Sequence, residues 1–219
     1  MPAGVAEPPA CIWVLAGTNG AGKSSIGGEF LRHAGGDYFN PDEVARRLLA
    51  AQPQLSATEA NSRAWHEGVR LLSTAIGNRH SYFFETTLGG DSIVGLLESA
   101  LDAGLEVRIW YAGLASPELH IARVAARVAK GGHAIPDADV RRRYDNSRLN
   151  LIRLLPRLSE LQVHDNSAEA DPARGEAPRP RLLLHWRDHE LVAPDYFAGT
   201  PDWAKPIVAA ALKARRPRR

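Results

Sequence analysis

One short segment limits the possible folds of this chain more than any other. Residues 17–24 have the sequence GTNGAGKS and match the phosphate-binding pattern G-x-x-x-x-G-K-[ST] at every fixed position. An apolar run, 11–16, precedes the segment, and helical spacing follows it over 24–33. Glycines let the backbone turn so that successive N–H groups face phosphate oxygens, and the following helix adds the positive end of its dipole. The pattern therefore predicts a P-loop, with the nucleotide held by Gly17, Thr18, Asn19, Gly20, Ala21, Gly22, Lys23, Ser24 and Ser25.

The end of this motif also predicts a cofactor. The ammonium of Lys23 is expected to reach the β- and γ-phosphates, and the hydroxyl of Ser24 to complete the ligand shell of a Mg²⁺ ion. The chain lacks both the N-K-x-D signal of GTPases and the L-S-G-G-Q segment of transporter ATPases. Its length of 219 residues is also small. Together these features favour a small-molecule kinase that uses ATP and Mg²⁺. The alternative for the segment 17–24 is a Gly-rich turn that binds nothing.

Apolar runs and helical patterns alternate along the rest of the chain. We expect strands at 11–16, 37–40, 81–85, 107–114, 161–164 and 181–186, and helices at 24–33, 42–51, 57–76, 91–103, 117–130, 136–155 and 202–214. This alternation predicts an α/β P-loop fold, a three-layer α/β/α sandwich with a mostly parallel sheet, in which 181–186 is an edge strand. We place residues 1–219 in a single domain, with a Pro-containing loop at 168–180 and a basic tail at 205–219.

Composition excludes several classes of protein. An apolar content of 44% with a net charge of +2 argues against disorder of the whole chain, and a single cysteine excludes a disulfide scaffold. No apolar run is long enough to span a membrane, and residues 1–10 carry no basic residue typical of a secretory signal. We therefore expect a cytoplasmic protein without a membrane partner.

Positive charge is concentrated in two places. Residues 118–157 hold nine Lys or Arg and four acids, and the tail from Lys205 holds six bases and no acid. Such blocks could meet a phosphate-rich ligand or a nucleic acid. The first block predicts a helical, Arg-rich lid at about 118–150, in which Arg123 and Arg127 share one helix face, with Lys130, His133 and the run 141–143 close by. The alternative is a solvated pair of basic helices.

Acidic and hydroxyl side chains follow two of the expected strands. Asp42 follows the second strand, and Glu85, Thr86 and Thr87 follow the third. Ligands of open α/β sheets bind outside the carboxyl ends of the strands, so these groups should face the P-loop. There Asp42 could accept the proton of an attacking hydroxyl, and the other three could orient the acceptor. The alternatives are that Asp42 only caps a helix and that 85–87 is a polar exit from the strand without a ligand.

These motifs in this order resemble the zeta toxin family of P-loop kinases, in its compact bacterial branch. The resemblance is carried by GTNGAGKSS at 17–25, NPDEVA at 40–45, FETTLGG at 84–90, the segment 115–136, RRRY at 141–144 and DNS at 165–167. It implies an adenylate-kinase-like core, ATP with Mg²⁺, and phosphorylation of UDP-N-acetylglucosamine at the 3′-hydroxyl of its amino sugar. A small antitoxin protein is the partner that the resemblance implies, and a nucleic acid is not an expected partner.

The resemblance also assigns roles to residues. It places the Walker lysine at Lys23, the general base at Asp42, the substrate-binding glutamate at Glu85 and the first phosphate-clamping arginine at Arg123. The second clamping arginine of the toxins aligns with His133, so Arg127 or Arg142 would have to take over that role.

Three functions remain open from the sequence. The first is an ATP-dependent kinase acting on a nucleotide-sugar, with UDP-N-acetylglucosamine as the leading acceptor. The second is a kinase of the same fold for another acceptor, such as NAD or a nucleoside. The third is a non-catalytic ATP-binding module that regulates or binds a partner.

Overall fold

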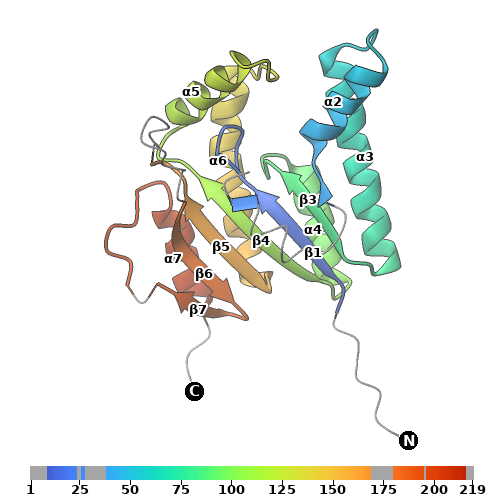
Figure 1. Cartoon of the computed structure of the whole chain (residues 1–219). Coiled ribbons are helices and arrows are strands. Elements are labelled where there is room, and N and C mark those ends of the chain that lie inside the picture. The colour runs from blue at the N-terminus through green and yellow to red at the C-terminus, as the bar shows by residue number, and fades with distance from the viewer. Residues whose placement is uncertain (1–8, 24–25, 28–37, 169–179, 195, 216–219) are drawn as a thin grey trace, which may run out of the picture.

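The computed structural model describes residues 9–23, 26–27, 38–168, 180–194 and 196–215. Within these residues one sheet has the strand order β2-β3-β1-β4-β5-β6-β7 (Figure 1). Its strands are Cys11–Ala16 (β1), Tyr38–Phe39 (β2), Tyr82–Thr86 (β3), Glu106–Gly113 (β4), Glu160–Asp165 (β5), Arg181–Arg187 (β6) and Glu190–Ala193 (β7). The helices are Pro41–Ala51 (α2), Ala57–Asn78 (α3), Asp91–Asp102 (α4), Pro117–Val128 (α5), Asp137–Leu154 (α6), the 3₁₀ turn Leu155–Arg157 (η1) and Lys205–Ala214 (α7).

The first five strands of the sheet order run parallel, as the alternation of elements predicts. β1 lies at the centre, between β3 and β4, and Ile12, Val14 and Leu15 are fully or almost fully buried in it. This burial on both faces explains why the segment is a continuous apolar run. Because parallel strands end at the same edge of the sheet, the loops that follow β1, β2, β3 and β4 gather at one place.

The far end of the sheet differs from the sequence prediction. The pattern predicts an edge strand at 181–186, but β6 is paired antiparallel on both sides, and the edge strand is β7, which the pattern does not predict. Asp188 and His189 form the turn between them, with left-handed φ values of 50° and 66°. Two-residue hairpin turns need this conformation, and Asn-Gly or Asp-Gly usually signals it. Since neither turn residue is glycine, the hairpin is not evident in the sequence.

Two apolar clusters cover the two faces of the sheet. Figure 1 shows α4, α6 and α7 behind the sheet, and Leu97, Leu151 and Ile207 from these helices join one core with the strands. On the opposite face Ile26 packs with Leu15 and Trp110. Of the predicted helix at 24–33 only residues 26–27 lie within the described part, and both are helical. The predicted loop at 168–180 and the last residues of the basic tail, 216–219, lie mostly or entirely outside it.

Helices α2 and α3 form a separate projection at one side of the sheet. They pack through small side chains, Ala45 against Ala60 and Ala64, and the far end of α3 joins the main core through Leu72. Helices α5 and α6 lie opposite α2 and α3, at the edge of the sheet where the parallel strands end (Figure 1). One face of α6 is buried from Val140 onward. The predicted lid at 118–150 therefore includes part of the core. No helix among the described residues has the length and apolar content to cross a membrane.

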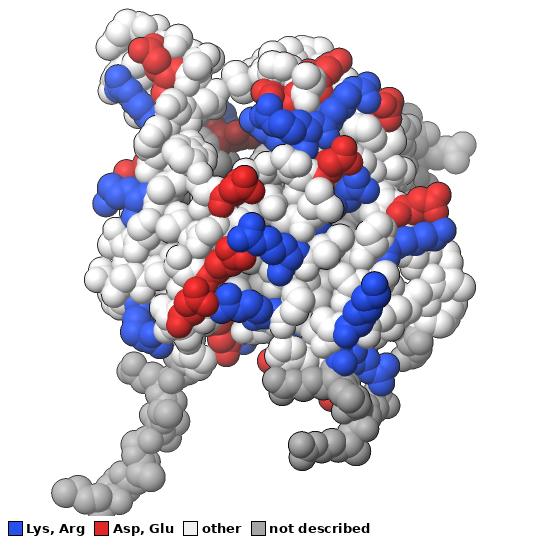
Figure 2. Space-filling model, turned by 180° about the vertical axis from the view of Figure 1, so that it is seen from behind, with Lys and Arg blue, Asp and Glu red and all other residues white. Residues whose placement is uncertain are grey.

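Most of the basic residues of the block 118–157 are paired with acids. Ion pairs join Arg141 to Glu118, Arg142 to Asp139, Arg148 to Asp145, Arg153 to Glu98 and Arg157 to Asp102. Figure 2 accordingly shows acidic and basic side chains side by side over this helical face, without a continuous basic patch. Within the described part of the chain, the positive charge of 118–157 is therefore largely balanced by neighbouring carboxylates.

Two buried polar side chains of α6 hold the loop that follows β3. The Ser147 hydroxyl donates to the Thr87 carbonyl at 2.7 Å and lies 3.1 Å from the Tyr111 hydroxyl, and the Asn150 amide donates to the Leu88 carbonyl at 2.9 Å. Both side chains are buried. The position of this loop therefore depends on α6 as well as on β3.

We predict that Ser147→Ala lowers the free energy of unfolding by about 1–3 kcal/mol, because the partly buried Thr87 carbonyl loses the buried hydroxyl that donates to it. Ser99→Ala is the matched control, since Ser99 is exposed and donates only within its own helix, to Gly95. Its effect should stay within about 0.5 kcal/mol. Urea denaturation of the three proteins measures both values, and equal stability of the two variants would contradict the account.

Candidate active site

The P-loop packs directly on neighbouring backbone. Gly17 and Gly20 have left-handed φ values of 141° and 81°. A Cβ atom would lie 2.2 Å from the Ala112 carbonyl oxygen at Gly17, and 2.5 Å from the His120 carbonyl oxygen at Gly20. Only glycine satisfies both the conformation and the space. The loop is thus fixed against β4 on one side and α5 on the other.

Lys23 lies between this loop and the end of β3. Its side chain is 9% exposed, and its ammonium donates to the Gly17 carbonyl at 2.8 Å. The same nitrogen lies 3.3 Å from Glu85 Oε1. A buried ammonium with one carboxylate neighbour is well placed to exchange that neighbour for a phosphate.

Glu85 accepts from donors in the P-loop, in β2 and at the start of α2. Besides Lys23, its carboxylate accepts from the Tyr38 hydroxyl at 2.6 Å and from the Asn40 amide at 3.2 Å, both through Oε2. Burial, together with the Glu85 charge, raises the pKa of Tyr38 above its ordinary value, so the phenol stays protonated and donates. These contacts fix the Glu85 carboxylate beside the P-loop.

Asp42 is not the N-cap of its helix. The Asn40 side chain caps α2 by accepting from the backbone N–H groups of Asp42 and Glu43. The alternative that Asp42 only caps a helix is therefore wrong. Its carboxylate is half-exposed and lies 3.6 Å from an Arg127 nitrogen, across the gap between α2 and α5.

His133 links the α5–α6 connection to the projection of α2 and α3. Its Nε2 lies 3.1 Å from the Asn61 side-chain nitrogen, and its carbonyl accepts from Arg127 at 3.2 Å. Arg127 therefore contacts both Asp42 and the His133 backbone. Two contacts, Asp42 to Arg127 and Asn61 to His133, thus cross from one side of the cavity to the other.

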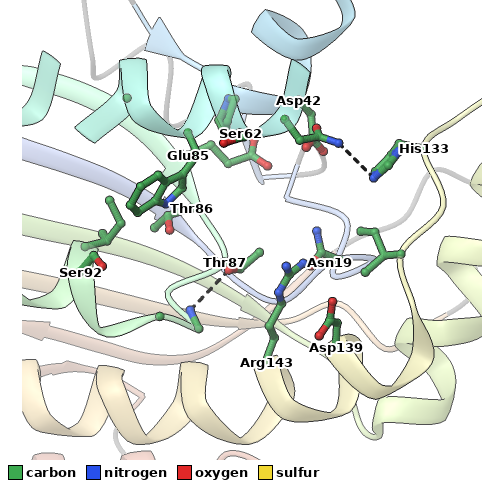
Figure 3. A pocket seen from close by; sticks show the side chains of 18 of the residues that line it. Asn19, Asp42, Ser62, Glu85, Thr86, Thr87, Ser92, His133, Asp139 and Arg143 are labelled. Atoms are coloured by element: carbon green, nitrogen blue, oxygen red, sulfur yellow. Dashed lines mark hydrogen bonds between the residues drawn. The ribbon is translucent and has the colours of Figure 1, made fainter. Parts of the chain in front are cut away.

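A cavity of about 500 Å³ joins these groups. Figure 3 shows Asp42 and Glu85 above it, and Asn19, Thr87 and Arg143 below it. Thr86 also lines the cavity, and so does His133. Its apolar lining, called the apolar wall below, consists of Phe39, Trp65, Val69, Phe84, Ile93 and Ile135. The predicted acceptor-side residues are therefore brought together in one pocket with one residue of the P-loop.

Some predicted residues lie elsewhere, and others were not predicted. Arg123 does not line the cavity, and its guanidinium donates to the Ala168 carbonyl at 3.3 Å. Ser24 and Ser25 lie outside the described residues. The sequence does not predict Trp65 or Arg143 as site residues. Trp65 could have been found only by placing α3 beside the edge of the sheet, and Arg143 only by choosing among three consecutive arginines.

Two side chains hold Asn19. The His120 Nδ1–H donates to the Asn19 carbonyl at 2.8 Å, because a carbonyl can only accept, and Arg143 donates to the Asn19 Oδ1 atom at 2.8 Å. Nearby, the Asn166 amide donates to the Ala21 carbonyl at 2.9 Å. Asn166, from the predicted DNS segment, thus supports the P-loop.

Burial lowers the pKa of His120 to about 4, and the Lys23 charge acts in the same direction. Burial also lowers the pKa of His164 to about 4. Below a pH of about 6.5 the unfolded chain takes up these protons, whereas the folded chain does not until about pH 4. The folded state therefore loses stability as the pH falls through this interval.

We predict that the free energy of unfolding drops by about 4 kcal/mol between pH 7.5 and pH 5, about 2 kcal/mol from each of the two histidines. His120→Gln keeps a side-chain donor but removes the titrating group, so this variant should lose only about half as much. Urea unfolding at the two pH values gives both differences. The assignment to His120 fails if the variant and the unchanged protein show the same pH dependence.

Comparison with known proteins gives one relative in sequence and several in structure. No protein-family model matches the chain. An uncharacterized protein of Haemophilus influenzae is 31% identical over 140 residues, which cover 61% of this chain and 96% of that protein.

Among solved structures, the AvrRxo1-ORF1:AvrRxo1-ORF2 complex with sulphate ions has a TM-score of 0.61 at 16% identity, covering 94% of this chain. The same complex with ATP gives the same values. The present chain spans 64% of that neighbour's length. A structure from the PezAT chromosomal toxin–antitoxin system of Streptococcus pneumoniae has a TM-score of 0.55 at 16% identity, covering 95% of this chain and 86% of that one. The chain therefore belongs to one family with the Haemophilus influenzae protein, and its fold is that of the zeta-toxin-like P-loop kinases.

Proposed function

We propose that the chain is an ATP-dependent kinase that phosphorylates a sugar hydroxyl of a nucleotide-sugar, with UDP-N-acetylglucosamine as the leading acceptor. One observation carries the proposal: a single cavity is lined by a P-loop residue, Asn19, and by the carboxylates of Asp42 and Glu85. A phosphoryl donor and a hydroxyl acceptor must meet at such a junction for transfer to occur.

The P-loop would bind the phosphoryl donor, ATP. Its backbone N–H groups and Lys23 would hold the triphosphate, with Lys23 exchanging the Glu85 carboxylate or the Gly17 carbonyl for phosphate oxygens. The ATP complex of a structural neighbour supports this choice of nucleotide.

A Mg²⁺ ion fits the donor set of this site. The described residues contain no cluster of three carboxylate, His or Cys ligands, but Glu85 supplies one carboxylate beside the P-loop. Mg²⁺ commonly takes one or two protein ligands and completes its shell with water and phosphate. Ser24 and Glu85 are the residues that would hold it, and the bound ion would neutralise charge on the phosphates.

The acceptor side depends on Asp42. We assign it as the general base that receives the proton of the acceptor hydroxyl, while the hydroxyl oxygen bonds to the γ-phosphorus and the bond to the bridging oxygen breaks to leave ADP. Its partner Arg127 would stabilise the transferring group once Asp42 turns to the acceptor. Neither Arg127 nor Arg123 lines the cavity, so a contact of either with a phosphate in it would require α5 to move.

The cavity also supports an acceptor with a flat ring. Trp65 is 44% exposed on the apolar wall, and the volume is in the range of sites for small ligands. A nucleotide-sugar offers both a base for this wall and hydroxyls for Asp42, Glu85, Thr86 and Thr87. NAD and nucleosides offer the same combination and are the alternative acceptors.

Two further proposals come from the comparisons and the charge layout. A small antitoxin remains a proposed partner, because one structural neighbour belongs to a toxin–antitoxin system.

A non-catalytic ATP-binding module is the remaining alternative function. The pairing of the α6 arginines with acids disfavours nucleic acid as its ligand.

The test of the function is transfer of a phosphoryl group from ATP. Incubation with ATP, Mg²⁺ and UDP-N-acetylglucosamine should give a product heavier by one phosphoryl group in mass spectrometry, and NAD and nucleosides are run in parallel. Asp42→Asn should lower kcat about 10²- to 10⁴-fold. Glu43→Gln is the matched control, because Glu43 lies in the same helix turn but pairs outward with Arg47.

Transfer to another acceptor alone would replace the proposed substrate. ATP binding without transfer to any acceptor would leave the non-catalytic module as the function. Full turnover by Asp42→Asn would remove Asp42 from the role of base.

We predict a second effect at the apolar wall. Trp65→Ala should raise KM for the acceptor about tenfold and leave KM for ATP nearly unchanged, because base stacking on an aromatic ring contributes about 1–3 kcal/mol. Leu149→Ala serves as the control, since Leu149 is exposed and does not line the cavity. An unchanged acceptor KM in the Trp65 variant would show that the ring of the acceptor lies elsewhere.

A further inference from the structure

The positive charges of 118–157 are not equivalent once their partners are known. Within the described part of the chain, six of the nine bases lie within ion-pair distance of a carboxylate. The other three are Arg123, Lys130 and Arg143, and of these only Arg143 lines the cavity. Its hydrogen-bonding partner there is the neutral amide of Asn19. The cavity therefore contains one guanidinium whose charge the described carboxylates do not balance.

The position of this guanidinium relative to the P-loop is well defined. Arg143 Nη1 donates to Asn19 Oδ1 at 2.8 Å, and the Thr18 hydroxyl donates to the Arg143 carbonyl at 3.3 Å. Figure 3 shows the Arg143 and Asn19 side chains directed toward one another at the floor of the cavity. Gly89 leaves room for the stem of Arg143, because a Cβ there would lie 2.9 Å from Arg143 Cγ. Arg143 thus joins the P-loop at the residue that faces the acceptor.

The terminal phosphate of a nucleotide should lie at this junction. Phosphates in a P-loop lie against the backbone N–H groups, with the lysine on the β- and γ-phosphates. Since Asn19 is the described P-loop residue that lines the cavity, we expect the γ-phosphate to be the phosphate nearest to Arg143. An arginine at that place can form two parallel hydrogen bonds to phosphoryl oxygens and neutralise the charge that develops during transfer.

We infer that Arg143 is a catalytic residue that contacts the γ-phosphate of ATP, in place of the clamping arginine that aligns with His133. This inference rests on the proposed kinase function. It assigns to Arg143 of α6, a helix fixed to the core, a contact that the resemblance places at His133 between α5 and α6, with Arg127 or Arg142 as its replacements. The arginine that contacts the phosphate then lies on a helix packed on the core. Arg143 needs only to exchange the Asn19 amide for phosphate oxygens.

The preference for ATP over ADP tests the contact independently of any acceptor. Competition with a fluorescent ADP analogue gives both affinities for the unchanged protein, Arg143→Gln and Arg141→Gln. Arg143→Gln should lower ATP affinity about 10- to 100-fold and change ADP affinity less than about threefold. Arg141→Gln is the control, because Arg141 pairs with Glu118 and does not line the cavity.

A second variant separates contact with phosphate from support of the loop. Asn19→Ala removes the hydrogen bond to Arg143 but keeps the guanidinium, so it should retain the preference for ATP. If Asn19→Ala and Arg143→Gln lose affinity for ATP and ADP equally, Arg143 only positions the loop and the inference is wrong. It is also wrong if Arg143→Gln keeps the ATP preference of the unchanged protein.

The same experiment distinguishes the inference from the proposed function. Loss of the ATP preference in Arg143→Gln, with no acceptor phosphorylated by the unchanged protein, would keep the Arg143 contact and overturn the kinase proposal. Failure of the unchanged protein to bind either nucleotide would overturn both.

Discussion

Direct packing of the P-loop on neighbouring backbone is the constraint on which the rest of the site depends. Gly17 touches the backbone of β4, and Gly20 touches the backbone of α5, at distances that leave no room for a side chain. This packing sets where Lys23 emerges beside Glu85 and where Asn19 opens into the cavity. Since β1 and β3 are parallel neighbours, the P-loop and the Glu85 carboxylate arise at the same edge of the sheet.

Charge in this protein is organised by local pairing, and its net value says little about the site. Arginines along α6 pair with acids on α5, α4 or α6 itself. Of the described residues that line the cavity, Arg143 lies on the P-loop side and Asp42 on the other, and Lys23 lies beside the cavity against Glu85. This arrangement suits an anionic donor beside a neutral hydroxyl, and the inferred roles of Arg143 and Asp42 both follow from it.

The sequence predicts what depends on short-range patterns. The strand–loop–helix order, the start of α5 at Ser116 and Pro117, and the parallel centre of the sheet are confirmed, because caps and apolar periodicity are local signals. The β6–β7 hairpin could not be predicted, since Asp188 and His189 adopt left-handed conformations without glycine. In the site, the edge of the sheet predicts the place of Asp42 and Glu85, whereas Trp65 and Arg143 depend on how α3 and α6 pack, which periodicity does not reveal.

The central claim is that the P-loop and the cavity are the donor and acceptor halves of one site. A crystal structure with a non-hydrolysable ATP analogue, Mg²⁺ and UDP-N-acetylglucosamine tests it most directly. The account predicts the γ-phosphate beside Asn19 and Arg143, and a sugar hydroxyl between that phosphate and Asp42. A triphosphate turned away from the cavity, or an acceptor bound outside it, would contradict the account.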